Sequence, residues 1–568
     1  MEPRRLILAV VLMAAVLLIS NMLFPPPKPT TTAKATADSL ARMATADSAT
    51  RAVTGVPTAN GTQPATVGAP AAGVSNPVEA AATIIIDTTS VETARTVYRT
   101  SSRGAALIGA QMRDYKALEN KSRVKGDPVE LARAGDKLIS FRLVGPKGDT
   151  TRLDQTAFRS TRSTANGNTV VHYDATLGAN PISIEYSFRP DSYRVNIATH
   201  VEGIDGGFVL VDLPPGFHSS EADTSEDANH LAYALKQENK NPIGITFRSL
   251  DPGERKIEAG PITWVVAKNK YFLVGALTPV GAPGFLELDV TGGVRSTKVA
   301  TRAQATIVTA MKSGNAAFEL YIGPQEFKRL VAVGRQFETS NPYGGFMQGI
   351  VQPFATMVIR VLLWMKTTLG LGYGWILVLF GVTVRILLWP LNQKAMRTSM
   401  AMQRIQPELQ AIQTKYKSDP QRLQTEMMKL YKEHNMSPFS SLSGCLPMLI
   451  PLPVFFALFF VFQNTIEFRG VPFLWLPDIS IRDPFFVLPV AVAITAMTLS
   501  WIGMKGMKAN DQQKIMMYMM PAMMLLFFFN MASGLNLYYL VQNLASLPQQ
   551  WLIAHERSKA AAQPLVRG

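Results

Sequence analysis

The sequence is poor in cysteine and in charge. Cys445 is the only cysteine among 568 residues, which excludes a disulfide framework or a cysteine-based zinc site within one chain. The apolar neighbours of Cys445 favour a buried, unreactive thiol. Charged residues make up 17% of the chain and hydrophobic residues 47%, and the length accommodates a soluble domain and a membrane bundle together.

Charge is almost absent from six apolar segments that we interpret as membrane spans. They are residues 6–24, 371–391, 446–465, 484–502, 515–530 and 535–553. The one charged side chain inside them is Arg385. A centrally placed Arg costs about 2.5–3.5 kcal/mol on insertion scales, so it should meet water, a backbone carbonyl or an anion. Alternatively, because Pro390 follows shortly after it, Arg385 snorkels to the headgroups on the cytoplasmic side.

Sequence motifs for catalysis are lacking as well. The spans carry no Asp pair, and neither His-Glu-x-x-His nor Gly-x-Ser-Gly occurs, which argues against an intramembrane protease. We therefore expect no enzyme activity, no cofactor and no metal. A transporter or channel is an alternative, but no acidic coupling site or pair of inverted repeats supports it. Nothing in the sequence brings together the histidines of the soluble part, which are His172, His200, His218 and His230.

The first part of the chain divides into three regions. Residues 1–24 are expected to form a signal anchor with a cytoplasmic N-terminus, because no Ala-x-Ala-like site follows the apolar run. Residues 25–82 are rich in Ala, Thr and Pro and predict a disordered tether. Residues 83–340 alternate apolar and polar side chains between turn residues, as in 137–144, 182–188 and 193–198, which predicts an antiparallel β-sandwich.

Such a sandwich resembles sugar-binding folds. A membrane-anchored periplasmic carbohydrate-binding protein therefore remains an alternative.

Residues 341–370 predict an amphipathic helix lying in the membrane interface, where Arg360 and Lys366 can snorkel. A five-span core follows at 371–553, and a tight hairpin at 531–534 is expected to join its last two spans. Its loop 392–440 holds eight Lys or Arg against four Asp or Glu, which places this loop in the cytoplasm and the β-domain on the opposite side. The tail 554–568 is short and basic, and it is expected to be cytoplasmic.

The loop 392–440 itself predicts a helical hairpin. Asp419 is expected to cap the second helix and Pro420 to occupy its first position, while Pro407 should kink or divide the first helix. Two interpretations of the hairpin remain open. It either buries its own apolar stripe, with a merely solvated basic exterior, or docks a partner.

Five motifs in this core resemble the YidC membrane insertases over about residues 345–553, in the same order and spacing. They are Val-Arg-Ile-Leu-Leu-Trp-Pro-Leu at 384–391, Gln-Pro at 406–407, Gly-Cys-Leu-Pro at 444–447, Gln-Gln-Lys-Ile at 512–515 and Ser-Gly-Leu-Asn-Leu-Tyr-Tyr at 533–539. The anchor, tether and β-domain resemble the Gram-negative branch, with local support from Trp264 and from Lys-Tyr-Phe at 270–272.

The resemblance implies a polytopic α-helical protein of the bacterial inner membrane, with six spans, a five-helix insertase core and a periplasmic antiparallel β-sandwich. Its function would be to insert and help fold inner-membrane proteins, alone or with the Sec translocon. Further implied partners are nascent membrane proteins, membrane lipids, and the ribosome or signal recognition components through the cytoplasmic hairpin. No specific nucleic acid is expected.

The resemblance also implies a hydrophilic groove, open to cytoplasm and lipid, that contains Arg385. A fixed positive charge in such a groove attracts acidic residues of the segment being translocated. Thr383, Gln542 and Asn543 are candidates to line it, although polar side chains in spans often make interhelical hydrogen bonds instead. The implied surface for the substrate helix contains Phe455, Phe459, Met520 and Met524, where flexible Met side chains suit varied partners or simply fill the core.

Overall fold

The computed structural model describes residues 87–118, 126–295, 300–342, 348–416, 419–433, 452–504 and 511–562. The expected signal anchor, the tether, Cys445 and the motif at 444–447 lie outside these residues. The structure therefore does not test these expectations.

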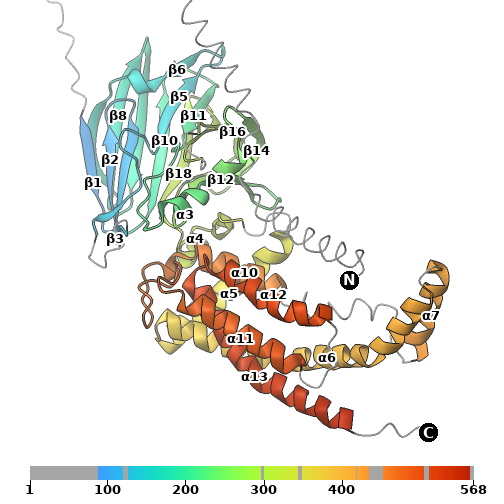
Figure 1. The fold of residues 1–568 in the computed structure, drawn as a ribbon. Coiled ribbons are helices and arrows are strands. Elements are labelled where there is room, and N and C mark those ends of the chain that lie inside the picture. The colour runs from blue at the N-terminus through green and yellow to red at the C-terminus, as the bar shows by residue number, and fades with distance from the viewer. Residues whose placement is uncertain are drawn as a thin grey trace, which may run out of the picture. The chain divides into compact units, whose positions relative to one another are not determined.

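The described residues before 343 form antiparallel β-sheets (Figure 1). One sheet has the order β1-β2-β3-β4, with strands Thr88–Glu92, Thr96–Ser101, Ala106–Lys116 and Pro128–Glu130. The larger sheet has the order β6-β5-β11-β17-β16-β14-β15-β18-β10-β9-β8-β7, and β12 pairs with β13 and β14 beside this path. This confirms antiparallel, sandwich-like sheets for the β-domain.

The strands of the larger sheet are β5 (Ser140–Val144), β6 (Thr150–Arg152), β7 (Arg159–Ala165), β8 (Asn168–Leu177), β9 (Asn180–Phe188), β10 (Arg194–Val201), β11 (Phe208–Asp212), β12 (Ala232–Gln237), β13 (Ile243–Thr246), β14 (Arg255–Lys268), β15 (Phe272–Leu277), β16 (Phe285–Gly292), β17 (Ala303–Ala310) and β18 (Asn315–Pro324).

Alternation along these strands produces the core of the β-domain. In β9, Ile182, Ile184, Tyr186 and Phe188 are buried while the residues between them are partly exposed. The same alternation in β10 brings a second apolar row into register beside it. In a sheet with one covered face, every second residue of a strand is buried. The alternation of apolar residues in the sequence therefore agrees with the alternation of buried residues in the strands.

The last strand leads into short helices that close the domain. Helix α4 (Phe327–Val333) follows β18, and Trp264 of β14 donates from Nε1 to the carbonyl of Arg335, 3.1 Å away. The ring of Trp264 also meets Phe337 edge-on at 5.6 Å. Trp264 is fully buried, so these contacts fix the end of the β-domain. A further short helix, α3 (Thr224–Asn229), lies between β11 and β12 in the chain.

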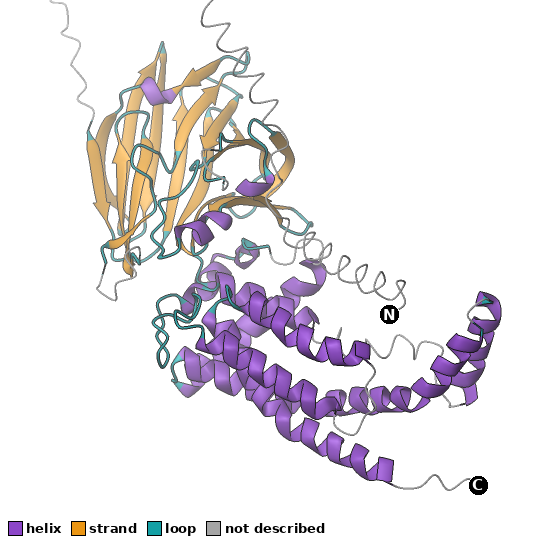
Figure 2. Cartoon of the chain, in the orientation of Figure 1, coloured by secondary structure: helices purple, strands orange, loops and turns teal. Residues whose placement is uncertain are grey.

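Long helices make up the rest of the described chain (Figure 2). They are α5 (Gln348–Leu369), α6 (Tyr373–Lys415), α7 (Pro420–Glu433), α10 (Leu452–Asn464), α11 (Val487–Met504), α12 (Asp511–Phe528) and α13 (Ser533–Ala562). Within the described residues, two segments are long and apolar enough to cross a membrane, Tyr373–Pro390 and Val487–Met504, and shorter apolar helices occur at Phe455–Asn464 and Met517–Phe528.

Some helix boundaries differ from those expected. The span expected at 371–391 and the first hairpin helix are one continuous helix, α6, which also continues through Pro407 without being divided there. Helix α13 likewise continues from the last expected span to Ala562, within the expected tail. An α-helix ends where its backbone loses hydrogen bonds, and a change from apolar to polar side chains does not by itself cause this.

Two expected helix termini are confirmed. Helix α7 begins at Pro420, and the carboxylate of Asp419 accepts a hydrogen bond from the backbone N–H of Arg422 at 3.1 Å. This is the capping contact that an Asp before an N1 proline favours. The tight connection expected at 531–534 is also present, since α12 ends at Phe528 and α13 starts at Ser533.

Candidate functional site

Helices α6 and α13 approach each other closely at Gly381. A Cβ atom placed on this glycine would lie 2.9 Å from Cγ1 of Val541, so the missing side chain is what allows the approach. The backbone carbonyl of Gly381 accepts a hydrogen bond from Nε2 of Gln542 at 2.8 Å. The same amide nitrogen lies 3.0 Å from the hydroxyl of Tyr538. Small residues and polar contacts of this kind hold helices together in membranes.

Arg385 lies one helical turn further along the same contact. Its Nη2 donates to Oε1 of Gln549 at 2.7 Å, and Nε2 of Gln549 donates to the carbonyl of Trp389 at 3.2 Å. The amide of Gln549 is buried, with 1% of the residue exposed, whereas Arg385 is half-buried. Among the described residues, Arg385 has no carboxylate partner, and its Nε is buried without a hydrogen-bond acceptor.

The other expected groove residues lie in different surroundings. Thr383 is exposed, and its hydroxyl donates to the carbonyl of Leu379 in its own helix. Asn543 turns to α11, where Nδ2 donates to the carbonyl of Val492 and to the hydroxyl of Thr495. The structure therefore brings Arg385 and Gln542 to one helix contact and places Thr383 on an exposed face. Asn543 makes interhelical hydrogen bonds, which was the alternative to lining the groove.

The residues expected to contact substrate lie on α10 and α12. Phe455 is half-buried, and its ring is 5.8 Å from that of Phe527 on α12 and 5.6 Å from that of Tyr539 on α13. Phe459 is 3% exposed and therefore belongs to the packed interior. Met520 and Met524 are half-buried on α12. Phe455 and the two Met residues are thus partly accessible, whereas Phe459 is not.

Sequence reasoning missed Gln549. The signal was present, because Gln549 follows Gln542 by seven residues and so returns to the same helix face two turns later. The sequence does not show which face of α13 meets α6, and Gln549 gains significance only once that face is known.

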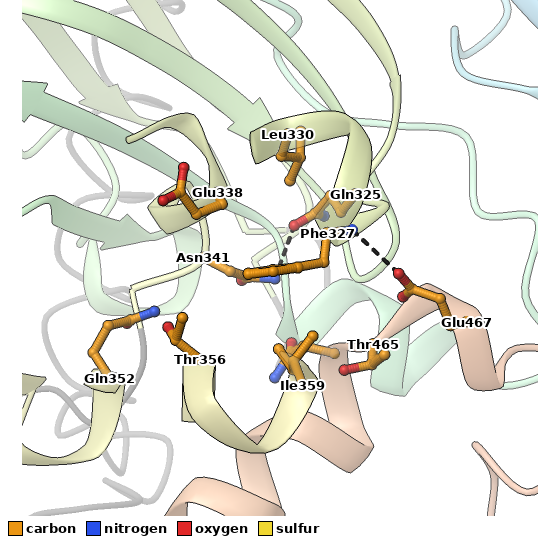
Figure 3. A pocket seen from close by; sticks show the side chains of 11 residues that line it. Gln325, Phe327, Leu330, Glu338, Asn341, Gln352, Thr356, Ile359, Thr465 and Glu467 are labelled. Carbon is orange, nitrogen blue, oxygen red and sulfur yellow. Dashed lines mark hydrogen bonds between the residues drawn. The ribbon is translucent and has the colours of Figure 1, made fainter. Parts of the chain in front are cut away.

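A small pocket lined by polar and apolar side chains lies where the end of the β-domain meets α5 and α10 (Figure 3). Its empty space is about 400 Å³, counting volume open to solvent. Oε1 of Glu467 accepts from the backbone N–H of Phe327 at 3.2 Å, and Nδ2 of Asn341 donates to Oε1 of Gln325 at 2.8 Å. Burial raises the pKa of the Glu467 carboxyl to about 7.

An ion pair joins the same two regions. Arg469, in the loop after α10, donates from Nε to Glu221 at 2.8 Å and from Nη2 to the carbonyl of Lys116 at 2.9 Å. Its guanidinium also lies 5.8 Å from the ring centres of Tyr271 and Phe272. Both charged side chains are almost completely buried, and burial raises the pKa of Glu221 to about 7 despite the neighbouring cation.

The described residues contain no group of three or more His, Cys, Asp or Glu side chains arranged to hold a metal ion. The site described above is therefore built from hydrogen-bond donors and acceptors, one cation and apolar surface. Such a set can hold and orient a polypeptide segment by charge and by apolar contact.

Comparisons with known proteins give the class of this protein. A family model described as the 60Kd inner membrane protein matches residues 364–560, and one described as the YidC periplasmic domain matches residues 88–357. Together they define an inner-membrane protein with a large periplasmic domain.

Individual relatives carry the same name. The membrane protein insertase YidC of Chlorobium phaeovibrioides is 33% identical over 81% of this chain and 82% of that protein. The YidC of Chlorobaculum tepidum is 29% identical with the same coverage. A crystal structure of an active YidC insertase with its first transmembrane domain resolved matches at 19% identity and a TM-score of 0.33, covering 82% of this chain and 94% of that one.

The chain belongs to the family of YidC membrane protein insertases, and its function is membrane protein insertion.

Proposed function

We propose that Arg385 attracts acidic residues of the substrate segment that crosses the membrane, within a hydrophilic groove open to the cytoplasm and to lipid. The observation that carries this proposal is that the side-chain partner of Arg385 among the described residues is a neutral amide, Gln549. A hydrogen bond to an amide orients the guanidinium and leaves its full positive charge for a passing anion. Water in the groove shortens the hydrocarbon that a polar segment must cross.

We further propose that the apolar helix of the substrate slides over α10 and α12. Phe455, Met520 and Met524 are partly accessible there and are the contacts that the packing supports. Methionine adapts to many partner shapes, which suits a surface that receives varied sequences. Phe459 supports this surface from within, because it is buried. Release into lipid is driven by burial of the apolar surface of the substrate, worth about 25 cal/mol per Å².

The topology proposed for this activity has six spans, both termini in the cytoplasm and the β-domain in the periplasm. Helix α5 is proposed to lie in the membrane interface, and it exposes Phe354, Met357 and Trp364 to lipid. The hairpin of α6 and α7 is proposed to contact the ribosome or signal recognition components. Nascent membrane proteins are the substrates, with the Sec translocon as a further partner, and the protein also assists their folding without covalent chemistry, cofactor or metal.

The test of the proposed function is charge removal at Arg385. Purified Arg385→Gln in proteoliposomes is expected to insert a single-span substrate with an acidic translocated tail roughly tenfold more slowly than wild type, a loss of about 1.4 kcal/mol. Insertion of the same substrate with a neutral tail should change little. Arg360→Gln, which removes an exposed cation from α5, is the matched control. Equal losses for both tails in Arg385→Gln would refute the electrostatic step.

A further inference from the structure

The amide of Gln549 occupies an unusual position beside the cation of the proposed groove. Oε1 accepts from Nη2 of Arg385, and Nε2 donates to the carbonyl of Trp389, so both ends of one buried amide are bonded to α6. Gln549 itself belongs to α13. A side chain held at both ends has one orientation, and the guanidinium that it binds is held in turn.

No acidic residue of α13 lies next to the pair formed by Arg385 and Gln549. The acidic residue on the same face of α13 is Glu556, which follows Gln549 by seven residues, about 10 Å along a helix. Glu556 is exposed and makes no ion pair with Arg385. A carboxylate at position 549 would have the same shape as the amide and would form an ion pair with Arg385, cancelling its charge.

We infer that Gln549 is a positioning residue that fixes the guanidinium of Arg385 between α6 and α13 while leaving its charge uncancelled, and that it thereby sets the preference of the insertase for acidic translocated segments. This inference rests on the proposed role of Arg385. The guanidinium of Arg385 is only half-buried, so a substrate carboxylate can reach it while Gln549 holds it in place.

The rest of the α6–α13 contact supports this role without depending on it. Gln542, which also contacts Tyr538 in its own helix, joins α13 to α6 at Gly381, one turn before Arg385. A change at Gln549 therefore leaves other interhelical contacts in place. A variant at Gln549 that loses the preference for acidic tails can therefore be distinguished from one in which α6 and α13 no longer pack together.

The test compares full-length variants in proteoliposomes, using single-span substrates whose translocated tails differ only in Asp or Asn content. The quantity measured is the ratio of insertion rates for acidic and neutral tails. Gln549→Glu is expected to lower this ratio about tenfold, to the value of Arg385→Gln. Gln549→Met, which loses both hydrogen bonds, is expected to lower the ratio by about threefold.

Gln550→Glu is the matched control, because it adds the same charge one residue further along, turned about 100° around the helix. It should keep the wild-type ratio. The double variant Arg385→Gln with Gln549→Arg restores one cation and one amide at the contact and should recover the preference.

The outcomes separate the two proposals. If Arg385→Gln abolishes the preference and Gln549→Glu does not, the inference about Gln549 is overturned while the role of Arg385 stands. If Arg385→Gln itself leaves the ratio unchanged, the proposed function fails and the inference fails with it. Thermal unfolding of each variant shows whether it is folded. If Gln549→Glu is misfolded, the ratio of insertion rates measured for Gln549→Met decides whether Gln549 sets the preference.

Discussion

At the residue scale, the sequence singles out Arg385 as a lone cation in an apolar segment but does not reveal its partner. Arg385 is conspicuous because the surrounding sequence is apolar, and elementary electrostatics demands a polar neighbour for it. Asn543 and Gln549 both occur in the last expected span, and nothing in the sequence distinguishes the one that turns to α11 from the one that turns to α6. The helix that each side chain of α13 points to is set by how the helices pack. At this contact, the close approach of α6 and α13 at Gly381 determines the packing.

Glu467 provides a second residue-scale feature, outside the proposed spans. Burial raises the pKa of its carboxyl to about 7, against an ordinary value of 4.5, and its Oε2 lacks a partner among the described residues. The folded state therefore binds a proton more tightly than the unfolded state does. The contribution of this group to stability is complete in acid and is lost as pH rises through about 7.

Glu467→Gln should remove that pH dependence, because the variant is neutral throughout. The stability of the variant relative to wild type is expected to rise by up to about 3 kcal/mol between about pH 5 and about pH 8. Thermal unfolding in detergent across this range measures the difference. Glu238→Gln, at an exposed carboxylate, is the control. A constant difference between Glu467→Gln and wild type would show that the carboxyl titrates normally.

At the element scale, the sequence predicted the type of most elements and misplaced some of their ends. The alternation at 182–188 falls within β9 and that at 193–198 largely within β10, because one buried face imposes period two. The order of strands in the sheet could not be predicted from the sequence, because strands distant in the chain pair with each other, as β15 does with β18. A span ending at residue 391 and a separate hairpin helix after it were expected, yet α6 is one helix through both.

The α6–α13 contact is the element-scale feature most open to test. Gly381→Val would place atoms within 3.6 Å of Tyr538 and 2.9 Å of Val541, counting the added Cβ alone. Overpacking of this kind costs about 1–3 kcal/mol. We expect a lowered unfolding temperature and slower insertion of both acidic and neutral substrates, because the helices must separate.

The control for this prediction is Gly349→Val in α5, where an added Cβ meets no atom within 4 Å. It should leave both unfolding temperature and insertion close to wild type. Wild-type stability for Gly381→Val would mean that α13 does not approach α6 as closely as described.

At the scale of the whole molecule, the β-domain and the helices are joined by the loop after α10. Ile466 of this loop belongs to the hydrophobic core of the β-domain, Glu467 accepts from Phe327, and Arg469 pairs with Glu221. The preceding helix, α10, carries Phe455 of the proposed substrate surface. The loop thus connects the periplasmic domain directly to a helix of the insertase core.

A substrate segment that passes beside Arg385 should be captured by a site-specific crosslinker in α6. Val382 lies one turn before Arg385 in α6 and is 37% exposed, so a photocrosslinker fits there. Ribosome-bound nascent membrane protein with an acidic translocated tail should be captured at Val382 more strongly than at Ile494 of α11, which is 60% exposed. Arg385→Gln should weaken that capture. Equal capture at Val382 and Ile494 would contradict the account.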